Sequence, residues 1–394
     1  MTRPFSGVGM PGSIFKIHMN RRTFFPTAAA VADIFAQELL ARAPGSQRKT
    51  KHIVLFTSDG VRWQDLFTGI DPNLMNAKTA GMAEASTLRK QLWRPTPEER
   101  REALMPFFWK TLVPKGILVG NLNKGSSMQV TNRYRVSYPG YSEILTGRAQ
   151  DDVIKGNDNI QNPTPSFLQF IIKKENLRPE QVAVFASWDN FKYSAESVPG
   201  ALFINAGYQR SDLPKNSARA DELNKLQFEA RFIADTSRHD AFTFGLATEY
   251  LDKLLPEHMY ISFDETDDWA HDRRYDEVLQ SLQFFDQALR DLWTYLQRSS
   301  KYRGTTTLVI TTDHGRGSTL ADFSDHGPKV PGDEQIWAAF IGPDTPETGE
   351  ATNTATCYQR DIAPTILDLL GFDYSDYSGA KGKPIGGAVV SGQA

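Results

Sequence analysis

Aspartates and histidines that could bind metal follow three apolar, strand-like runs of this sequence, 52–58, 258–264 and 306–312. In open α/β sheets, the carboxyl ends of parallel strands meet at one edge, and ligands bind there. Mixed imidazole and carboxylate ligands suit Zn²⁺ or Mn²⁺. Each residue alone is more simply a cap, turn or surface residue, but together they predict two metal sites. The candidates are Asp59, Asp267, His271, Asp313, His314 and His326.

The most acidic of these stretches is FDETDDWAHD, residues 263–272, which contains five carboxylates and one histidine. Such a run is either a solvated loop or the surroundings of a cation. The spacing from Asp267 to His271 places both side chains on one face of a helix. A bound dication would remove the repulsion, and a further carboxylate could orient the other nitrogen of His271. The remaining acids are Asp264, Glu265, Asp268 and Asp272.

A candidate nucleophile lies in VSYPGYSEILTGR, residues 136–148, where Ser137 precedes a Pro-Gly pair and an apolar helical segment. The N-terminus of a helix stabilises an anion through its free N–H groups and its dipole. A nearby metal would lower the pKa of the hydroxyl and activate it. Serine is also a common helix cap, and Ser142 remains a second candidate.

Alternating strand-like and helical patterns must position these residues, which indicates an α/β fold with a largely parallel central sheet flanked by helices. We expect strands near 52–58, 115–122, 182–187, 258–264, 306–312 and 334–342, and helices near 97–112, 165–176, 239–254, 272–298 and 360–370. The polar, loop-rich segments 65–96 and 188–238 are predicted to be insertions within one catalytic domain, 51–375. The Gly/Ser-rich residues 376–394 are predicted to form a flexible tail.

The composition excludes several classes of protein. The net charge of −3 argues against a dedicated nucleic-acid-binding surface. The single cysteine, Cys357, excludes an intrachain disulfide and a cysteine-rich zinc site. No run of eighteen apolar residues occurs, so no transmembrane segment is expected.

The N-terminal segment 19–43 is predicted to be an export leader. It contains Arg21 and Arg22, then an Ala-rich stretch that ends in Ala-Arg-Ala. This pattern resembles a bacterial twin-arginine signal. Cleavage would remove residues 1–43, and the mature protein would begin near Pro44. The protein would then be periplasmic or secreted; without a functional signal it would be cytoplasmic.

Over about residues 51–370, the motifs resemble those of the alkaline phosphatase superfamily, which includes phosphatases, phosphodiesterases, phosphoglycerate mutases and sulfatases. Five segments occur in the family's order: VLFTSDGVRW, SYPGYSEILTG, DETDDWAH, TTDHG and His326-Gly327. They are similar, in turn, to the first metal-binding strand, the nucleophile segment, the Asp-x-x-x-His pair, the Asp-His pair and the final His-Gly. The resemblance implies a three-layer α/β sandwich of the alkaline-phosphatase type.

The resemblance also implies a role for each site residue. One metal would be bound by Asp267, His271 and His326. The other would be bound by Asp59, Asp313, His314 and the oxygen of Ser137. Asn157, with Asn159 as an alternative, would contact a phosphoryl oxygen, and Tyr141 and Arg148 are further candidate substrate contacts.

We therefore predict a metal-dependent hydrolase of small phosphate monoesters or diesters that forms a phosphoseryl intermediate on Ser137. Two divalent ions are expected, Zn²⁺ first and Mn²⁺ as the alternative. Sulfatases carry an arginine where this chain has Tyr141, which weighs against sulfate esters. A sulfate- or phosphonate-ester hydrolase and a phosphoglycerate-mutase-like enzyme remain alternatives on the same scaffold. A non-catalytic binding protein would show a lost ligand, and no ligand of the pattern is missing. The oligomeric state stays open.

Overall fold

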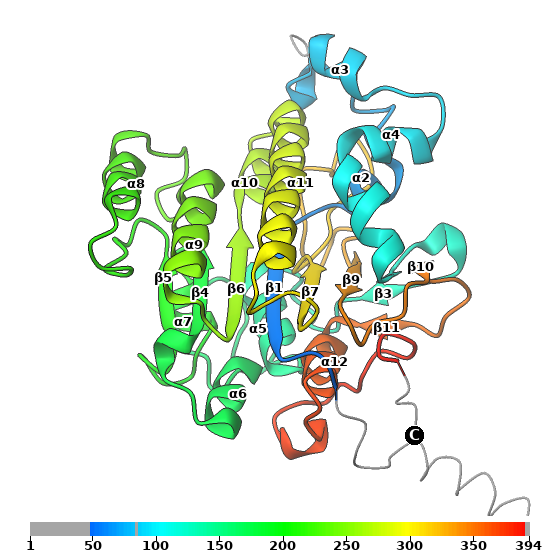
Figure 1. Cartoon of the computed structure of the whole chain (residues 1–394). Helices are drawn as coiled ribbons and strands as arrows, with labels where there is room; N and C mark the ends of the chain where they lie inside the picture. The colour runs from blue at the N-terminus through cyan, green and yellow to red at the C-terminus, as the bar shows by residue number, and fades with distance from the viewer. Residues whose placement is uncertain (1–47, 83–85, 391–394) are drawn as a thin grey trace, which may run out of the picture. The chain divides into compact units, whose positions relative to one another are not determined.

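A sheet of eight strands forms the centre of the computed structural model, which describes residues 48–82 and 86–390 (Figure 1). The strand order is β10-β2-β9-β7-β1-β6-β4-β5, and a second sheet has the order β11-β3-β8. The strands are β1 (His52–Ser58), β2 (Ile117–Val119), β3 (Met128–Gln129), β4 (Val182–Ala186), β5 (Phe203–Ala206), β6 (His258–Phe263), β7 (Thr306–Thr311), β8 (Gln335–Ile336), β9 (Ala338–Ile341), β10 (Gly349–Glu350) and β11 (Cys357–Tyr358).

The large sheet is mostly parallel, as predicted. β1 pairs in parallel with both β6 and β7, and β4 pairs in parallel with β6 and β5. Only β9 runs against its neighbours β7 and β2 among the described strands of this sheet. The seven residues of β1 are all buried, which explains why this central strand reads as a continuous apolar run.

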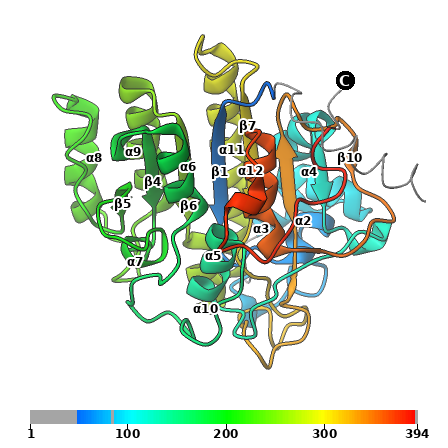
Figure 2. The same cartoon turned by 90° about the horizontal axis from the view of Figure 1, so that it is seen from below.

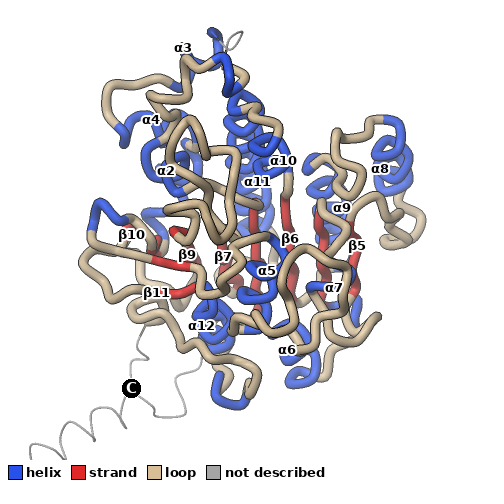
Figure 3. The backbone as a smooth tube through the Cα atoms, turned by 180° about the vertical axis from the view of Figure 1, so that it is seen from behind, coloured by secondary structure: helices blue, strands red, loops and turns tan. Residues whose placement is uncertain are grey.

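Helices cover both faces of the sheet, and the alternation of side chains along β1 separates two hydrophobic cores. Val54 and Phe56 face one core, and Ile53 and Leu55 face the other. The first core contains side chains of α2, α4, α9 and α11, and the second contains side chains of α5, α6, α7 and α12. The second group of helices lies in front of the strands in Figure 3, and Figure 2 gives the view from below. The three-layer α/β sandwich is therefore confirmed.

The helices of the described chain are α2 (Trp63–Thr68), α3 (Ser86–Leu92), α4 (Pro97–Leu104), α5 (Ser137–Thr146), α6 (Phe167–Glu175), α7 (Phe191–Ser194), α8 (Ala218–Glu229), α9 (Asp240–Leu254), α10 (Glu265–His271), α11 (Tyr275–Arg298) and α12 (Ile362–Leu369). No helix in residues 48–82 and 86–390 combines the length and apolar character needed to cross a bilayer.

Two predicted helices differ from the observed ones. The helix expected at 97–112 is divided into α4 and a π-helical turn at Phe108–Leu112, because Pro106 has no backbone N–H to continue the helix. The helix expected at 272–298 begins only at Tyr275. Arg273 has φ 57°, a left-handed conformation that separates α10 from α11.

The segments predicted as insertions and tail contain ordered elements. Residues 188–238 include α7, α8 and the edge strand β5. Near the C-terminus, Tyr377, Ile385 and Ala388 pack in the second core. The leader predicted at 1–43 lies outside the described residues.

Candidate metal centre and active-site cavity

The six predicted metal ligands meet at the edge of the sheet where β1, β6 and β7 end. Asp59 directly follows β1, α10 carries its two ligands just after β6, and Asp313 and His314 follow β7. The side chains form two groups, and within each group the possible ligand atoms all lie within 4.8 Å of one another. We call Asp59, Asp313 and His314 the inner group, and Asp267, His271 and His326 the outer group.

The inner group is completely buried. All three side chains have 0% exposure, and His314 Nε2 lies 3.4 Å from both Asp59 Oδ1 and Asp313 Oδ2. The second oxygen of each carboxylate already has a partner: Gly60 N donates to Asp313 Oδ1 at 3.0 Å, and Tyr141 Oη donates to Asp59 Oδ2 at 2.9 Å. Each carboxylate therefore directs one bound oxygen to the protein and one free oxygen to His314.

The outer group is more open to solvent. Its helix spacing is the one that the sequence predicts, with Asp267 Oδ2 3.1 Å from His271 Nε2 on α10. His271 Nε2 lies 3.0 Å from His326 Nε2, and the His271 side chain is 47% exposed. The rings of His314 and His326 stack with centroids 3.9 Å apart. The inner and outer groups are therefore direct neighbours.

Two of the histidines present an unprotonated nitrogen to these carboxylates. His314 Nδ1 lies 2.9 Å from the carbonyl oxygen of Gly315, and His326 Nδ1 lies 2.9 Å from that of Arg135. A carbonyl oxygen only accepts hydrogen bonds, so Nδ1 carries the proton in both neutral rings. The lone pair of each Nε2 then points into the centre, which is the usual arrangement of a metal-binding histidine.

The inner group shows an imbalance of charge that a cation would correct. Asp59 Oδ1 and Asp313 Oδ2 are buried and have no hydrogen-bond partner. Burial, followed by repulsion from Asp313 and Asp267, raises the pKa of Asp59 well above its ordinary range. Burial also lowers the pKa of His326 to about 4. Free carboxylate oxygens beside the imidazole lone pair of His314 fit a divalent cation in the inner group, and the ligand atoms of the outer group lie close enough together to hold a second one.

Gly60 allows the two groups to approach each other. Its φ of 57° is left-handed, and a Cβ atom there would lie only 2.6 Å from Asp267 Oδ1 and 3.2 Å from His314 Cε1. A side chain at this position would therefore clash with Asp267, crowd His314 and strain the backbone. This is the physical reason for the glycine that follows Asp59.

Ser137 lies at the start of α5, as predicted, with its Oγ 3.4 Å from His314 Nε2. Gly140 lets the helix pack closely, since a Cβ there would lie 2.4 Å from the carbonyl oxygen of Asp313. Ser142 is buried further along the helix and accepts a hydrogen bond from Gln150 Nε2 at 2.6 Å. The geometry thus favours Ser137 over Ser142 as the residue that faces the metal centre.

A cavity of about 390 Å³ opens beside Ser137. Asn157 and Asn159 both line it. Asn157 Oδ1 accepts from the backbone N–H of Tyr138 at 2.9 Å, and its amide N–H₂ group, which can donate two hydrogen bonds, donates none to the described part of the chain. The other lining residues are Trp188, Asp189, Thr236, Ser237, Asp264, Asp267, Asp268 and His271.

Two predicted substrate contacts lie elsewhere. Tyr141 has 0% exposure, and its hydroxyl donates to Asp59 Oδ2 at 2.9 Å and accepts from Ser262 Oγ at 3.3 Å. Arg148 follows the C-terminus of α5, about 15 Å along the helix from Ser137. Neither residue is among those that line the cavity.

None of the other acids of 263–272 has a hydrogen bond or ion pair with His271 within the described chain, and two of them have partners elsewhere. Glu265 Oε1 lies 2.8 Å from His239 Nδ1, and Asp264 accepts a hydrogen bond from Ser237 Oγ. Arg316 was not among the predicted site residues, but it is 2% exposed and donates to Asp267 Oδ1. Burial raises the pKa of Asp267, but Arg316 and then His271 reverse this and leave it well below its ordinary range. The position of Arg316 directly after Asp-His-Gly was the available signal.

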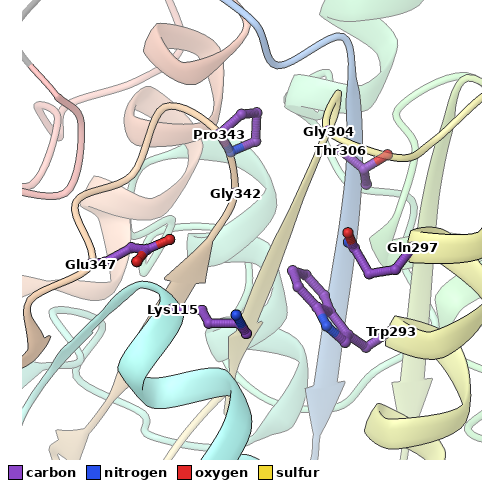
Figure 4. A pocket seen from close by; sticks show the side chains of 8 residues that line it. All are labelled: Lys115, Trp293, Gln297, Gly304, Thr306, Gly342, Pro343 and Glu347. Carbon is purple, nitrogen blue, oxygen red and sulfur yellow. The ribbon is translucent and has the colours of Figure 1, made fainter.

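A second cavity, of about 210 Å³, lies near the start of β7, at the opposite edge of the sheet (Figure 4). Trp293 and Gln297 of α11 face Lys115 and Glu347 across it. Its lining includes one carboxylate and no histidine or cysteine, so it offers no group comparable to the metal centre.

Comparisons with known proteins agree with this site. Residues 135–328 match the family model of type I phosphodiesterases and nucleotide pyrophosphatases. No curated protein matches the sequence. That family segment contains Ser137, the whole outer group, Asp313 and His314.

Solved structures share the fold at low sequence identity. The alkaline phosphatase PafA aligns with a TM-score of 0.55 and 11% identity, covering 86% of this chain and 99% of PafA. The lipoteichoic acid synthase LtaP from Listeria monocytogenes aligns with a TM-score of 0.51 and 13% identity, covering 89% and 76%. Ps i-CgsB in complex with k-i-k-neocarrahexaose has the same TM-score and identity, covering 85% and 75%. The family match and this fold together show that the chain belongs to the alkaline phosphatase superfamily and is a metal-dependent hydrolase of phosphoric esters.

Proposed function

We propose that the chain hydrolyses phosphate monoesters or diesters through a phosphoseryl intermediate on Ser137. The observation that carries this proposal is the position of Ser137 Oγ, 3.4 Å from His314 Nε2, at the start of α5 and on the wall of a 390 Å³ cavity. A hydroxyl next to two groups of metal-binding residues has the surroundings that an activated nucleophile requires.

Two divalent cations would be bound by the residues of the inner and outer groups. Ser137 Oγ would complete the inner set. Zn²⁺ fits the mixture of histidine and carboxylate ligands best, with Mn²⁺ as the alternative. When bound, such cations lower the pKa of a neighbouring hydroxyl and neutralise charge on phosphoryl oxygens.

The protein's own groups would position the substrate. Ser137 Oγ gives its proton to solvent and attacks phosphorus, the bond from phosphorus to the ester oxygen breaks, and the alcohol leaves with a proton taken from solvent. The free amide N–H₂ of Asn157 donates to a phosphoryl oxygen, while its Oδ1 stays bound to the backbone of α5. The N-terminus of α5 adds its dipole and free N–H groups to the stabilisation of that charge.

In the second half-reaction, water attacks phosphorus and the bond to Ser137 Oγ breaks. Phosphate, or the remaining monoester, is released and the serine hydroxyl is restored. The same groups act in both halves, so the barrier is lowered mainly by positioning and by stabilisation of charge.

The test is the Ser137→Ala variant, assayed with aryl phosphate and bis-aryl phosphate after zinc loading. We expect turnover to fall by about a thousandfold or more, while the zinc content measured by elemental analysis stays near two per chain. Mass spectrometry of acid-quenched wild type should find phosphate on residue 137. Full activity in the variant would refute Ser137 as nucleophile, and Ser142→Ala would be the next variant. Parallel assays with aryl sulfate and phosphonate esters separate the alternative substrates.

The leader remains a proposal as well. We propose that Arg21 and Arg22 belong to a twin-arginine signal and that the mature enzyme starts near Pro44 in the periplasm or outside the cell. N-terminal sequencing of the exported protein would test this. An unprocessed N-terminus in a cytoplasmic fraction would contradict it.

A further inference from the structure

One buried carboxylate outside both metal-binding groups connects the loops that form the site. The side chain of Asp333 has 0% exposure, and the residue lies shortly before β8. Its Oδ2 accepts a hydrogen bond from the backbone N–H of Gly327, which follows His326 of the outer group. Its backbone carbonyl oxygen accepts from Gly315 N at 2.8 Å, next to His314 of the inner group. Asp333 therefore links the loops of the two groups, although it belongs to neither.

Arg135 connects Asp333 to a third segment, which carries the candidate nucleophile. Arg135 Nη1 lies 2.9 Å from Asp333 Oδ1 and 2.8 Å from Glu334 Oε2. Asp333 Oδ1 has no hydrogen-bond partner in the described chain, so the charge of Arg135 compensates it. Arg135 lies just before Ser137, and its carbonyl oxygen accepts from His326 Nδ1 at 2.9 Å. The same residue therefore orients the ring of an outer ligand and leads into the nucleophile segment.

The backbone conformation of Arg135 needs support from its surroundings. Its φ of 48° is left-handed, which is unfavourable for a residue with a side chain. Such a conformation persists only where neighbouring contacts fix it. Two contacts do so here: Arg135 N donates to Asn132 Oδ1 at 2.8 Å, and the guanidinium group is held by Asp333. Without the ion pair, we expect the carbonyl oxygen of Arg135 to lose its fixed direction toward His326.

The second sheet brings Asp333 and Arg135 together. β8 follows Asp333 and pairs antiparallel with β3, which precedes Arg135 in the chain. Val130 N also donates to the carbonyl oxygen of Glu334 at 3.0 Å. Because this pairing fixes the register of the two segments, backbone hydrogen bonds place both residues of the ion pair.

Resting on the metal sites of the proposed function, we propose that Asp333 and Arg135 are positioning residues for His326 and Ser137. Neither of the two is among the residues that line the 390 Å³ cavity. They act through the carbonyl oxygen of Arg135, which keeps the proton on His326 Nδ1 and leaves Nε2 free for the outer cation. A hydrogen-bonding partner of this kind raises metal affinity by about ten- to a hundredfold.

The effect should be confined to the outer group. His314 of the inner group bonds through Nδ1 to the carbonyl oxygen of Gly315, at 2.9 Å. The bond from Gly315 N goes to the backbone of Asp333 and does not depend on its side chain. A change in the Asp333 carboxylate should therefore weaken the binding of one cation and not of the other.

The experiment measures the affinity of each zinc in the Asp333→Asn variant. This variant keeps the shape of the side chain and an oxygen for Gly327 N, but it removes the charge that faces Arg135. In competition with a chelator, we expect the outer zinc to bind about tenfold more weakly and the inner zinc to stay within about twofold. His271→Ala, which lacks an outer ligand, identifies the outer zinc in these titrations. At saturating zinc, kcat for bis-p-nitrophenyl phosphate should fall by about tenfold while KM changes by less than about twofold.

Glu334→Gln is the matched control, because it removes the other carboxylate beside Arg135. The Glu334 side chain is 34% exposed, so its ion pair is weak, and both zinc affinities should stay within about twofold. Arg135→Met should reproduce the effect of Asp333→Asn, and Arg135→Lys should keep part of the affinity because it retains the charge. The double variant Arg135→Met/Asp333→Asn should lose about as much as the stronger single variant, since both changes act through one pair.

The outcomes separate this inference from the proposed function. An outer zinc that binds Asp333→Asn as tightly as wild type would overturn the inference, and so would equal weakening of both zincs or additive losses in the double variant. If Asp333→Asn does not fold in denaturant titrations of the metal-free protein, the zinc affinities of Arg135→Met decide in its place. If the zinc-loaded wild type turns over no phosphate ester, the proposed function fails, while the two zinc affinities still decide the inference.

Discussion

The two ends of the central sheet contain the same residue types in opposite states. At the end where β1 and β6 begin, His258 Nδ1 accepts from Ile53 N at 3.2 Å and its Nε2 contacts Glu175 Oε2 at 3.1 Å. Glu257 contacts both His52 and Lys301. At the other end, Asp59 Oδ1 and Asp313 Oδ2 are buried without a partner.

This difference shows which histidine–carboxylate cluster can have a function. A network in which each group has a partner stabilises the fold and has no free valence for a ligand. Buried oxygens without partners are unfavourable unless a cation or substrate satisfies them. Both ends of the sheet contain histidines and carboxylates, so residue type does not distinguish them. What distinguishes them is whether each polar atom has a hydrogen-bond partner.

The largest effect should follow removal of charge from the inner group. Asp313→Asn keeps the shape and the hydrogen bond from Gly60, but it replaces a free carboxylate oxygen with an amide. We expect metal content to fall from about two to about one per chain and turnover to fall at least a hundredfold. Elemental analysis and steady-state kinetics measure the two. Unchanged metal content would contradict the comparison of the two ends, because the free oxygen of Asp313 would then not be a metal ligand.

At the opposite end, His258→Ala should affect only stability. It leaves the Ile53 N–H and Glu175 without their partner and opens a cavity at a side chain with 0% exposure. We expect the free energy of unfolding to fall by about 2–4 kcal/mol, with metal content and kcat/KM unchanged. Denaturant titration checks this. His271→Ala is the contrasting variant. It should lose metal, and its stability without metal should be close to that of the metal-free wild type.

A smaller effect should follow from Tyr141→Phe, which removes the hydrogen bond to Asp59 Oδ2 at 2.9 Å and a longer one, 3.3 Å, that Ser262 Oγ donates to the Tyr141 hydroxyl. Loss of an orienting group of this kind lowers metal affinity by about tenfold. Competition with a chelator would measure the change. Tyr260→Phe is the control, because Tyr260 is equally buried and its hydroxyl contacts Thr57 rather than a metal ligand. Equal effects in both variants would assign the change to packing.

The smallest effect concerns acid stability at the far end. Burial lowers the pKa of His52 from 6.5, partly offset by Glu257; Lys301 and His258 lower it further. Because the unfolded chain binds the proton more tightly, stability is fully present above about pH 6.5 and decreases as the pH falls through the folded pKa. His52→Gln should reduce this decrease by less than about 1 kcal/mol in unfolding curves at several pH values. A steeper decrease would show that His52 is better stabilised when charged.

Much of the framework follows from local pattern. The apolar run of β1 indicates a strand buried on both faces. Six of the buried apolar residues of α11 recur at helical spacing, namely Val278, Leu282, Phe285, Leu289, Leu292 and Leu296. The spacing of Asp267 and His271 predicted that both project from one face of a helix. These features depend on short-range periodicity, which a single sequence contains.

Other features depend on contacts between distant segments. The antiparallel direction of β9 and the membership of β5 in the sheet were not predicted, because strand pairing is set by the whole fold. The part that Arg316 takes at Asp267, 49 residues away, also becomes visible only when β7 lies near α10. Tyr141 was predicted to touch substrate, and its contact with Asp59 spans 82 residues.

The amino-acid sequence by itself determined the residue types at the strand ends, the layered fold and the chemical class of the centre, because side-chain period and ligand chemistry are local properties. Only the tertiary structure decided which carboxylate oxygens remain free and which ring nitrogen of His314 and of His326 carries the proton. Those properties arise from pairs of atoms that the chain brings together across long separations, and burial then makes each unpaired atom count.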